Sequence, residues 1–388
     1  MAALDERYRE YATPRQWQVL ETLAEHGPVK AAAVLGVNRS YVTRVRQAVR
    51  AKAAQHGFAP DHDMLYPAAP GFKVKGTSTL YDNSTGEPRL QWVKTTADAE
   101  QQEQMFRDMV EALASELPRL PSVDPPGTAS ADLCACYPVG DHHMGLLAWH
   151  EENGGENYNI KEAERLLMGA VDHLVQTTPN CDQALLAILG DFFHYDSPKP
   201  ITPTSGHQLD ADSRPSEMIR AGLRVLKYLI EALRRHHGKV HIIIEIGNHD
   251  PYTALFLMEA FASMYEADER VTVDTSPRHY HYFRFGKCLI GTHHGHGAKL
   301  QDLPLIMATD RPEDWGATTY RYFWTDHDHH DRMKDIRQVK VEGFRILAPS
   351  DAWADKSGYR SMRDMRAIVL HRDHGEVARH TVNPEMLL

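Results

Sequence analysis

Three things that the sequence lacks narrow the class of protein. It has only 4 cysteines in 388 residues, which excludes the disulfide framework of small secreted proteins. No apolar run approaches the length of a membrane-spanning helix. The stretch Met1–Arg15 is too highly charged for a signal peptide. We therefore expect a cytoplasmic protein that does not bind membranes.

The remaining composition is that of a globular protein with an unusual number of histidines. Apolar residues make up 42% and charged residues 25% of the chain, and its length predicts two or three domains. Many of the 24 histidines fall in short clusters, which indicates metal binding. The net charge is −10, but residues 1–60 carry +4 and the remainder carries −14. A basic head on an acidic body indicates that the head meets a polyanion.

The head, residues 1–57, is predicted to be a small all-α domain of helix-turn-helix type. Thr13-Pro14 begins a first helix, Gly27-Pro28 ends it, and an alanine-rich helix follows. Residues 36–38 form a tight turn, and Asn38 or Ser40 caps a third helix. In this layout the second helix of the pair enters the major groove of DNA.

The third helix carries donors suited to phosphates and base edges. We predict that its exposed face binds DNA through Asn38, Arg39, Ser40, Tyr41, Thr43, Arg44, Arg46, Gln47 and Arg50. The alternative is a three-helix packing module whose basic face is merely solvated.

Residues 58–131 are predicted to be a linker that contains a β-hairpin and a helix. Residues 72–80 and 89–94 alternate as strands do, on either side of the turn 82–86. Residues 97–117 predict a polar helix. The stretch 118–131 has four prolines and is the strongest candidate for a domain boundary.

Residues 132–388 alternate strands with helices, and five predicted strands are followed by Asp, Asn or His. The strands are 133–139, 184–189, 241–246, 287–291 and 320–324, and the helices are 160–177, 218–236 and 255–265. In an open α/β sheet, ligand-binding groups collect beyond the carboxyl ends of the strands. One such end, for example Asn248-His249-Asp250, is also explained by an Asx-type turn. Five in sequence indicate a site.

Oxygen and imidazole ligands of this kind suit two closely spaced divalent metals. Manganese is expected first, with iron, zinc or magnesium as alternatives. Two metals about 3.5–4 Å apart can clamp a phosphate, activate a water and stabilise the leaving oxygen. Because most residues of such a site must be ligands, one remaining histidine is expected to handle the proton.

The order and rough spacing of these groups resemble the calcineurin-like metallophosphoesterases over residues 132–350. The resemblance rests on the motifs Asp141-x-His143, Gly190-Asp191, Gly247-Asn248-His249-Asp250, His294-Gly295 and His327-x-His329. The run Gly190–His194 is further similar to the SbcD-type DNA repair nucleases, and the joined helix-turn-helix resembles proteins carried by bacteriophages. The resemblance implies an α/β fold for residues 132–388, a four-layer α/β/β/α sandwich.

The resemblance also implies a role for each motif residue. The first metal would be bound by Asp141, His143, Asp191 and His329. The second would be bound by Asp191 as a bridge and by Asn248, His294 and His327. His249 would stabilise the transition state or act as general acid, with Asp250 as its orienting residue. His194 would act near the leaving group or the scissile phosphate.

Two features complicate this assignment. Asp326 stands where the family usually has glycine, so we expect it to shift that loop or to add negative charge behind the ligands. His293, His294 and His296 compete for one ligand role, and the resemblance favours His294 because the family's ligand precedes a glycine.

The other segments of this region receive simpler predictions. His142 and His330 are expected to be outward neighbours rather than ligands. Residues 195–216 form an insertion that is expected to lie over the metal cleft, although an ordinary solvated loop explains them equally well. Residues 339–382 are expected to close the sandwich without contributing chemistry.

Three functions are compatible with these patterns. The first is a metal-dependent phosphodiesterase acting on DNA, an exo- or endonuclease. The second is a phosphatase or small-substrate phosphodiesterase, and the third is a non-catalytic DNA-binding regulator with a phosphoesterase-like body. The complete set of metal-competent groups argues against the third. DNA is the expected partner, and a homodimer or higher homo-oligomer is expected because such heads pair across half-sites.

Overall fold

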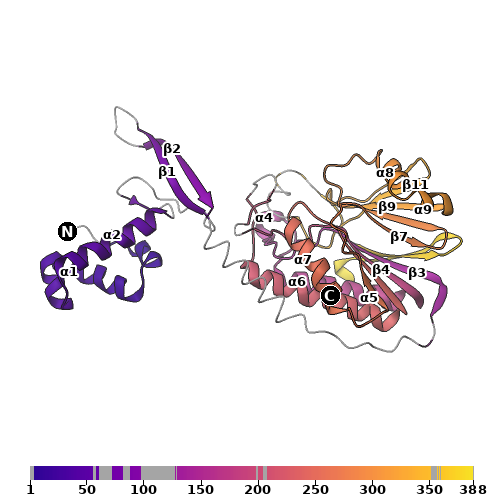
Figure 1. Cartoon of the computed structure of the whole chain (residues 1–388), viewed down its shortest axis with the longest axis horizontal. Helices are drawn as coiled ribbons and strands as arrows, with labels where there is room; N and C mark the ends of the chain where they lie inside the picture. Colours follow the sequence, from indigo (N-terminus) through magenta and orange to yellow (C-terminus); the bar gives the residue numbers. More distant parts are fainter. Residues whose placement is uncertain are drawn as a thin grey trace. The chain divides into compact units, whose positions relative to one another are not determined.

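The computed structural model describes residues 4–55, 58–60, 72–81, 88–97, 127, 129–197, 200–203, 208–350, 356, 358 and 360–387 (Figure 1). It contains two compact units, Met1–Gln104 and Met105–Leu388. The boundaries at residues 57 and 131 stay predictions. Apart from residue 97, the predicted helix 97–117 lies outside the described residues.

The first unit contains the helical segments expected from the sequence, preceded by the short η1 (Glu6–Tyr11). Thr13 forms a capping box at the start of α1 (Pro14–Leu35), which is broken at Gly27, where φ is 74° and ψ is 167°. Helix α2 (Arg39–Gln55) follows the left-handed Gly36. The Asn38 side chain accepts a hydrogen bond from Tyr41 N (2.8 Å), so Asn38 is the cap. The hairpin is confirmed by β1 (Phe72–Tyr81) and β2 (Pro88–Ala97), which pair antiparallel.

The second unit is built on two sheets. The six-stranded sheet has the order β13-β12-β3-β4-β5-β6 and the five-stranded sheet the order β10-β11-β9-β8-β7. The six-stranded sheet consists of β3 (Ser130–Val139), β4 (Cys181–Ile188), β5 (Lys239–Ile244), β6 (Val271–Val273), β12 (Met365–His371) and β13 (Gly375–Val382). The five-stranded sheet consists of β7 (His281–Phe285), β8 (Cys288–Thr292), β9 (Tyr320–Thr325), β10 (Arg332–Ile336) and β11 (Val339–Gly343).

Helices cover the outer faces of both sheets (Figure 1). The helices of this unit are α4 (His150–Asn153), α5 (Ile160–Thr177), α6 (Pro215–His236), α7 (Pro251–Met264), α8 (Leu303–Asp310), α9 (Pro312–Ala317) and the C-terminal η3 (Pro384–Leu387). Of these, α5, α6 and α7 pack on the six-stranded sheet and α8 packs on the five-stranded sheet. Among the residues that the structure describes, no helix has both the length and the apolar character needed to cross a bilayer.

The alternation of strand side chains produces the layers. Leu185 and Ile243 point between the sheets, where they join Trp324 of the five-stranded sheet in one buried cluster. Their sequence neighbours Leu186 and Ile242 point the other way and pack in the cluster that contains the buried faces of α5, α6 and α7. On the far side, α8 packs on β8, β9 and β11. The predicted four-layer α/β/β/α sandwich is therefore confirmed.

This assignment of layers predicts a stability difference between two apolar side chains. Ile243→Ala opens a cavity between the sheets and is expected to cost about 2–5 kcal/mol of unfolding free energy. Leu305→Ala removes a side chain that is 59% exposed on α8 and is expected to change stability by less than about 0.5 kcal/mol. Urea denaturation followed by circular dichroism measures both. Equal losses in the two variants would contradict the placement of Ile243.

Candidate metal centre

The five loops that carry the predicted ligands leave neighbouring strands. β3, β4 and β5 are parallel neighbours in the six-stranded sheet. Their last residues, Val139, Ile188 and Ile244, pair with one another in register, so the three strands end at the same edge. β8 and β9 are also parallel neighbours in the second sheet. Because the carboxyl ends of parallel strands lie at the same edge, the loops that follow them come together.

One cluster joins Asp141, His143 and His329. Nε2 of His329 lies 2.8 Å from Oδ2 of Asp141 and 3.4 Å from Nε2 of His143. One ligand atom from each of the three residues lies within 4.8 Å of the others. These are three of the four groups predicted for the first metal.

A second cluster joins Asp191, His294 and His327, again with ligand atoms within 4.8 Å of one another. Nε2 of His294 lies 3.2 Å from Oδ2 of Asp191 and 2.9 Å from Oδ1 of Asn248. Nδ1 of His294 donates to the Leu189 carbonyl (2.9 Å), which leaves Nε2 as the ligand atom. The structure therefore brings together all seven predicted ligands.

The three adjacent histidines after β8 occupy different environments. His294 is 1% exposed and faces both carboxylates, with Nδ1 also 3.4 Å from Oδ1 of Asp141. His293 points elsewhere: its ring stacks on Tyr280 and its Nδ1 accepts a hydrogen bond from Gly295 N (2.8 Å). The His296 ring lies 5.1 Å from that of His294, beside the cluster. Geometry thus favours His294 as the ligand.

Four of the predicted ligands have a left-handed backbone. The φ angles are 49° at His143, 43° at Asp191, 71° at His327 and 55° at His329. Among the described residues, the other non-glycine positions with positive φ are the adjacent turn residues 337 and 338. Side chains other than glycine adopt this conformation at a cost, and such residues cluster at functional sites.

Close packing explains the glycines of two motifs. A Cβ atom on Gly247 would lie 2.1 Å from Oδ1 and 2.3 Å from the backbone N of Asp191. A Cβ atom on Gly190, where φ is 100°, would lie 2.5 Å from Nδ1 of His294. Only glycine lets these backbones approach the ligands so closely.

The two buried carboxyl groups have opposite pKa shifts. Burial raises the pKa of Asp141 well above its usual value, against the attraction of His294. Burial also acts to raise the pKa of Asp191, but His294, His249 and His143 together lower it well below its usual value. Oδ1 of Asp141 is buried and accepts no hydrogen bond from any described residue.

The imidazoles complete an environment suited to cations. Burial and the neighbouring histidines lower the pKa of His143 well below its usual value, so this ring is neutral and ready to act as a ligand. Burial alone would lower the pKa of His294, but Asp191 and Asp141 raise it well above its usual value. A site that attracts positive charge, contains a buried carboxylate oxygen without a hydrogen bond and offers oxygen and nitrogen ligand atoms fits divalent cations.

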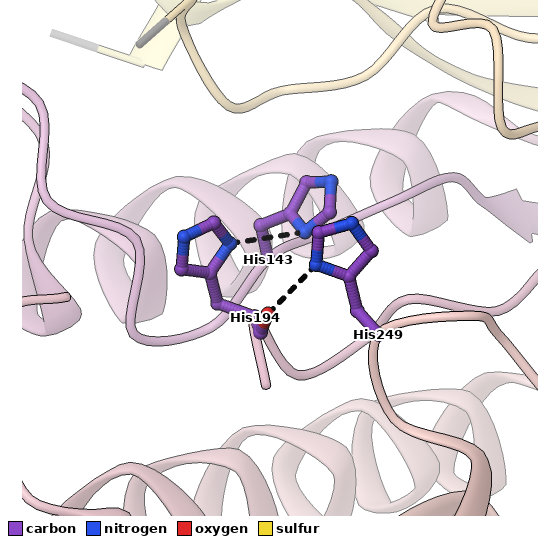
Figure 2. A group of neighbouring side chains, drawn as sticks. All are labelled: His143, His194 and His249. Atoms are coloured by element: carbon purple, nitrogen blue, oxygen red, sulfur yellow. Dashed lines mark hydrogen bonds between the residues drawn. The ribbon is translucent and has the colours of Figure 1, made fainter. Parts of the chain in front are cut away.

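His143, His194 and His249 face one another beside the first cluster (Figure 2). Nδ1 of His249 donates to the main-chain carbonyl of His194 (2.8 Å), so its Nε2 is the ring nitrogen that faces the ligands, 3.9 Å from Oδ2 of Asp191. Nδ1 of His194 lies 3.4 Å from Nδ1 of His143. Burial and the adjacent His249 lower the pKa of His194 to about 3, so this ring is neutral.

The predicted role of Asp250 requires a correction. Its Oδ2 accepts a hydrogen bond from Phe193 N (2.9 Å) and thereby holds the loop after β4. The group that orients the His249 ring is the His194 carbonyl. Asp250 is 1% exposed, and burial together with nearby Asp191 raises its pKa well above its usual value.

Asp326 lies behind the ligands, as expected, and connects two of them. Its Oδ2 accepts a hydrogen bond from Asp141 N (2.9 Å), and its own N–H donates to the His294 carbonyl (2.8 Å). A Cβ atom on Gly140 would lie 1.9 Å from Oδ2 of Asp326. The Asp326 side chain therefore ties the loop after β3 to the loop after β9.

Neither His142 nor His330 belongs to the two ligand clusters, but neither simply points away from the site. His330 is exposed and lines the cleft beside the clusters. His142 is 2% exposed, its ring lies 5.3 Å from that of Phe192, and burial lowers its pKa to about 3. His142 is buried because its surroundings are apolar, and a neutral histidine packs there as an aromatic ring.

A cleft of about 550 Å³ opens beside the clusters. Thr202, Gln208 and Leu209 line it, so described residues of the insertion face the cleft; residues 198–199 and 204–207 lie outside the described part. Residues 346, 348–350 and 361–363 line it too. The prediction that residues 339–382 only close the sandwich is thus wrong. No motif in this segment signals its position, which depends on long-range packing.

The predicted DNA-binding residues lie along the start and one face of α2. Arg39, Arg44, Arg46, Gln47 and Arg50 are exposed, whereas Tyr41 and Thr43 are half-buried. Asn38 and Ser40 are exposed as well, but Asn38 Oδ1 accepts hydrogen bonds from Ser40 Oγ and Tyr41 N, both 2.8 Å, within the cap. The opposite face, with three valines, is buried.

Comparisons with known proteins provide little further guidance. No protein-family model and no curated protein matches the chain. A predicted phosphoesterase from Streptococcus pneumoniae TIGR4 aligns over 65% of this chain and 99% of its own, with 11% identity and a TM-score of 0.28. An archaeal phosphodiesterase aligns over 64% of this chain and 99% of its own, with 12% identity and a TM-score of 0.31. The E. coli phosphoesterase Yfce aligns over 64% of this chain and 100% of its own, with 13% identity and a TM-score of 0.32. Similarity this low supports no conclusion about the chemistry of this chain.

The geometry predicts that two adjacent histidines differ in metal binding. His294→Ala removes a ligand that faces both carboxylates, so we expect manganese affinity to fall by at least about 10- to 100-fold. His293→Ala is the matched control and should retain the affinity of the unaltered chain. Metal content after dialysis, measured by atomic emission, distinguishes the variants once circular dichroism has shown that both fold. A loss confined to His293→Ala would contradict the assignment.

Proposed function

We propose that this chain is a metal-dependent phosphodiesterase that acts on DNA, as an exo- or endonuclease. The observation that carries the proposal is the convergence of seven metal-competent side chains at five strand ends, four of them with strained backbone. Such strain persists only where the surrounding structure holds it. The motif order supports placing the second unit with the calcineurin-like metallophosphoesterases, nearest the SbcD-type nucleases.

Two divalent cations, manganese first, fit this donor set. Asp141, His143 and His329 would hold one, and Asn248, His294 and His327 the other, with Asp191 between them. When bound, the cations would polarise the phosphate and make water more acidic, which is the chemistry that hydrolysis of a phosphodiester requires.

The remaining histidines are placed to handle protons. Because Nδ1 of His249 is held by the His194 carbonyl, its Nε2 is the atom that can donate to a phosphate oxygen or to the leaving oxygen. His249 lines the cleft. His194 also lines the cleft and lies beside His143. It would act near the leaving group or the scissile phosphate.

The proposal that the substrate is DNA rests on the first unit. Exposed arginines and polar side chains follow one face of α2, and residues 1–60 carry the positive charge of an otherwise acidic chain. Such a face suits phosphate contacts and base edges. By the same argument we propose a homodimer or higher homo-oligomer, because DNA-reading helices commonly pair across half-sites.

One observation favours a second candidate, a phosphodiesterase or phosphatase for small substrates. The cleft volume of about 550 Å³ is within the range of sites that enclose a single small ligand. In that case the first unit would serve assembly rather than substrate capture.

The proposed chemistry predicts the effect of replacing His249. In the presence of manganese the chain is expected to degrade DNA, and His249→Ala is expected to lower the rate at least about a hundredfold because the proton donor is lost. Metal content should stay unchanged, because His249 is not among the proposed ligands. Gel assays on linear and circular DNA, with and without EDTA, measure the effect.

Each outcome of this assay separates the candidates. Loss of linear DNA alone indicates an exonuclease, and loss of both forms an endonuclease. If neither DNA is cut but an aryl phosphodiester is hydrolysed, the small-substrate function holds. If nothing is hydrolysed with manganese, zinc or magnesium, the enzymatic proposal fails and the non-catalytic regulator replaces it.

The proposed DNA-binding face predicts the effect of replacing arginines on α2. Arg39→Ala and Arg44→Ala each remove an exposed cation from the proposed DNA face. Each is expected to reduce the slope of log affinity against log salt by about 1. Lys30→Ala, an exposed cation on α1, is the matched control and should leave the slope unchanged. Fluorescence anisotropy of labelled duplex DNA measures binding, and an equal effect of all three variants would contradict a specific face.

A further inference from the structure

Arg363 has no place in the proposed machinery, yet it lines the cleft beside the metal centre. It precedes β12, in a segment that carries no sequence motif connecting it with the site. Its side chain is 18% exposed, so a molecule in the cleft can reach it. Among the described residues that line the cleft, Arg363 is the only lysine or arginine.

The guanidinium of Arg363 is held in position by two contacts. Nε donates to the Leu347 carbonyl (2.8 Å), and Nη1 donates to Oε2 of Glu156 (3.0 Å). Nη2 is shielded from solvent and has no hydrogen-bond acceptor among the described residues. Because a shielded atom does not face the cleft, Nη2 is not the donor that a bound molecule would meet. Nη1 carries a second N–H besides the one that it donates to Glu156. A fixed arginine with such a donor in the wall of a cleft suits an oxyanion.

The distribution of charge in the cleft identifies what that oxyanion would be. The cations proposed at Asp191 and its neighbours would hold the phosphate that is cleaved. The arginine is thus left for another negative group of the same molecule. Arginine recognises phosphate through parallel N–H donors, and it does so more specifically than lysine because its donors form a planar fork.

We propose that Arg363 is a specificity-determining residue that binds a second phosphate of the substrate, next to the scissile one. This inference rests on the proposed function. It narrows the substrate class to phosphodiesters that carry a further phosphate close by, whether in a polynucleotide or in a small phosphorylated nucleotide. Glu156 would hold the guanidinium in position for this contact.

The test measures binding of product-like ligands to the manganese-loaded chain by calorimetry. The probes are thymidine 3′,5′-bisphosphate and the two thymidine monophosphates. The unaltered chain is expected to prefer the bisphosphate. In Arg363→Ala and Arg363→Gln that preference should fall by about 10- to 100-fold, since a charge-assisted hydrogen bond is lost. Arg363→Lys should retain part of it, and Glu156→Gln, which leaves the cation in place, should retain most of it.

The result that overturns the proposal is an unchanged preference in both uncharged Arg363 variants, or the absence of a preference in the unaltered chain. Hydrolysis of an aryl phosphodiester, which has no second phosphate, should be equal in all variants. The calorimetric measurement needs no turnover, so it tests the role of Arg363 independently of the proposed function. If the proposed function fails, no variant hydrolyses the phosphodiester, but the ratio of bisphosphate to monophosphate affinity can still be compared between variants. Melting curves and metal content exclude misfolding as the cause of a loss.

Discussion

The structure around the site depends on the burial of two carboxylates, Asp141 and Asp191, at the ends of adjacent parallel strands. They are 0% and 1% exposed, and buried negative charge must be compensated. His329 and His294 lie against them, and His249 N donates to Asp191 Oδ1 at 2.8 Å. The surrounding histidines follow from this requirement, and Nδ1 of His294 lies 3.4 Å from the second oxygen of Asp141 as well.

Much of the frame could be predicted from the sequence because its signals are local. Apolar runs rich in β-branched residues predict strands, and the helix predicted at 160–177 has the bounds of α5. The polar groups that follow the strands were predicted by residue type and order. The parallel register of β3, β4 and β5 then places those groups together without further information. The choice of His294 over His293 also agrees with the geometry, although the sequence alone left it open.

The features that the sequence could not predict depend on contacts between distant segments. Arg363 contacts Glu156 and Leu347, and no local pattern marks a wall residue of a cleft. The family resemblance implies that Asp250 orients His249, but the partner of Asp250 is the backbone N–H of Phe193, which follows another strand. His142 is buried for the same reason, since the loop after β4 folds over it. Burial of a polar residue in a loop has no periodic signature.

The ligands come from both sheets. Asp141, Asp191 and Asn248 follow strands of the six-stranded sheet, whereas His294, His327 and His329 follow strands of the five-stranded sheet. A cation held by this set would act as a cross-link between the two halves of the sandwich, much as a disulfide joins two strands. Its binding free energy would then add to the stability of the folded second unit. Local opening of the sheets and release of the ion would be a single event.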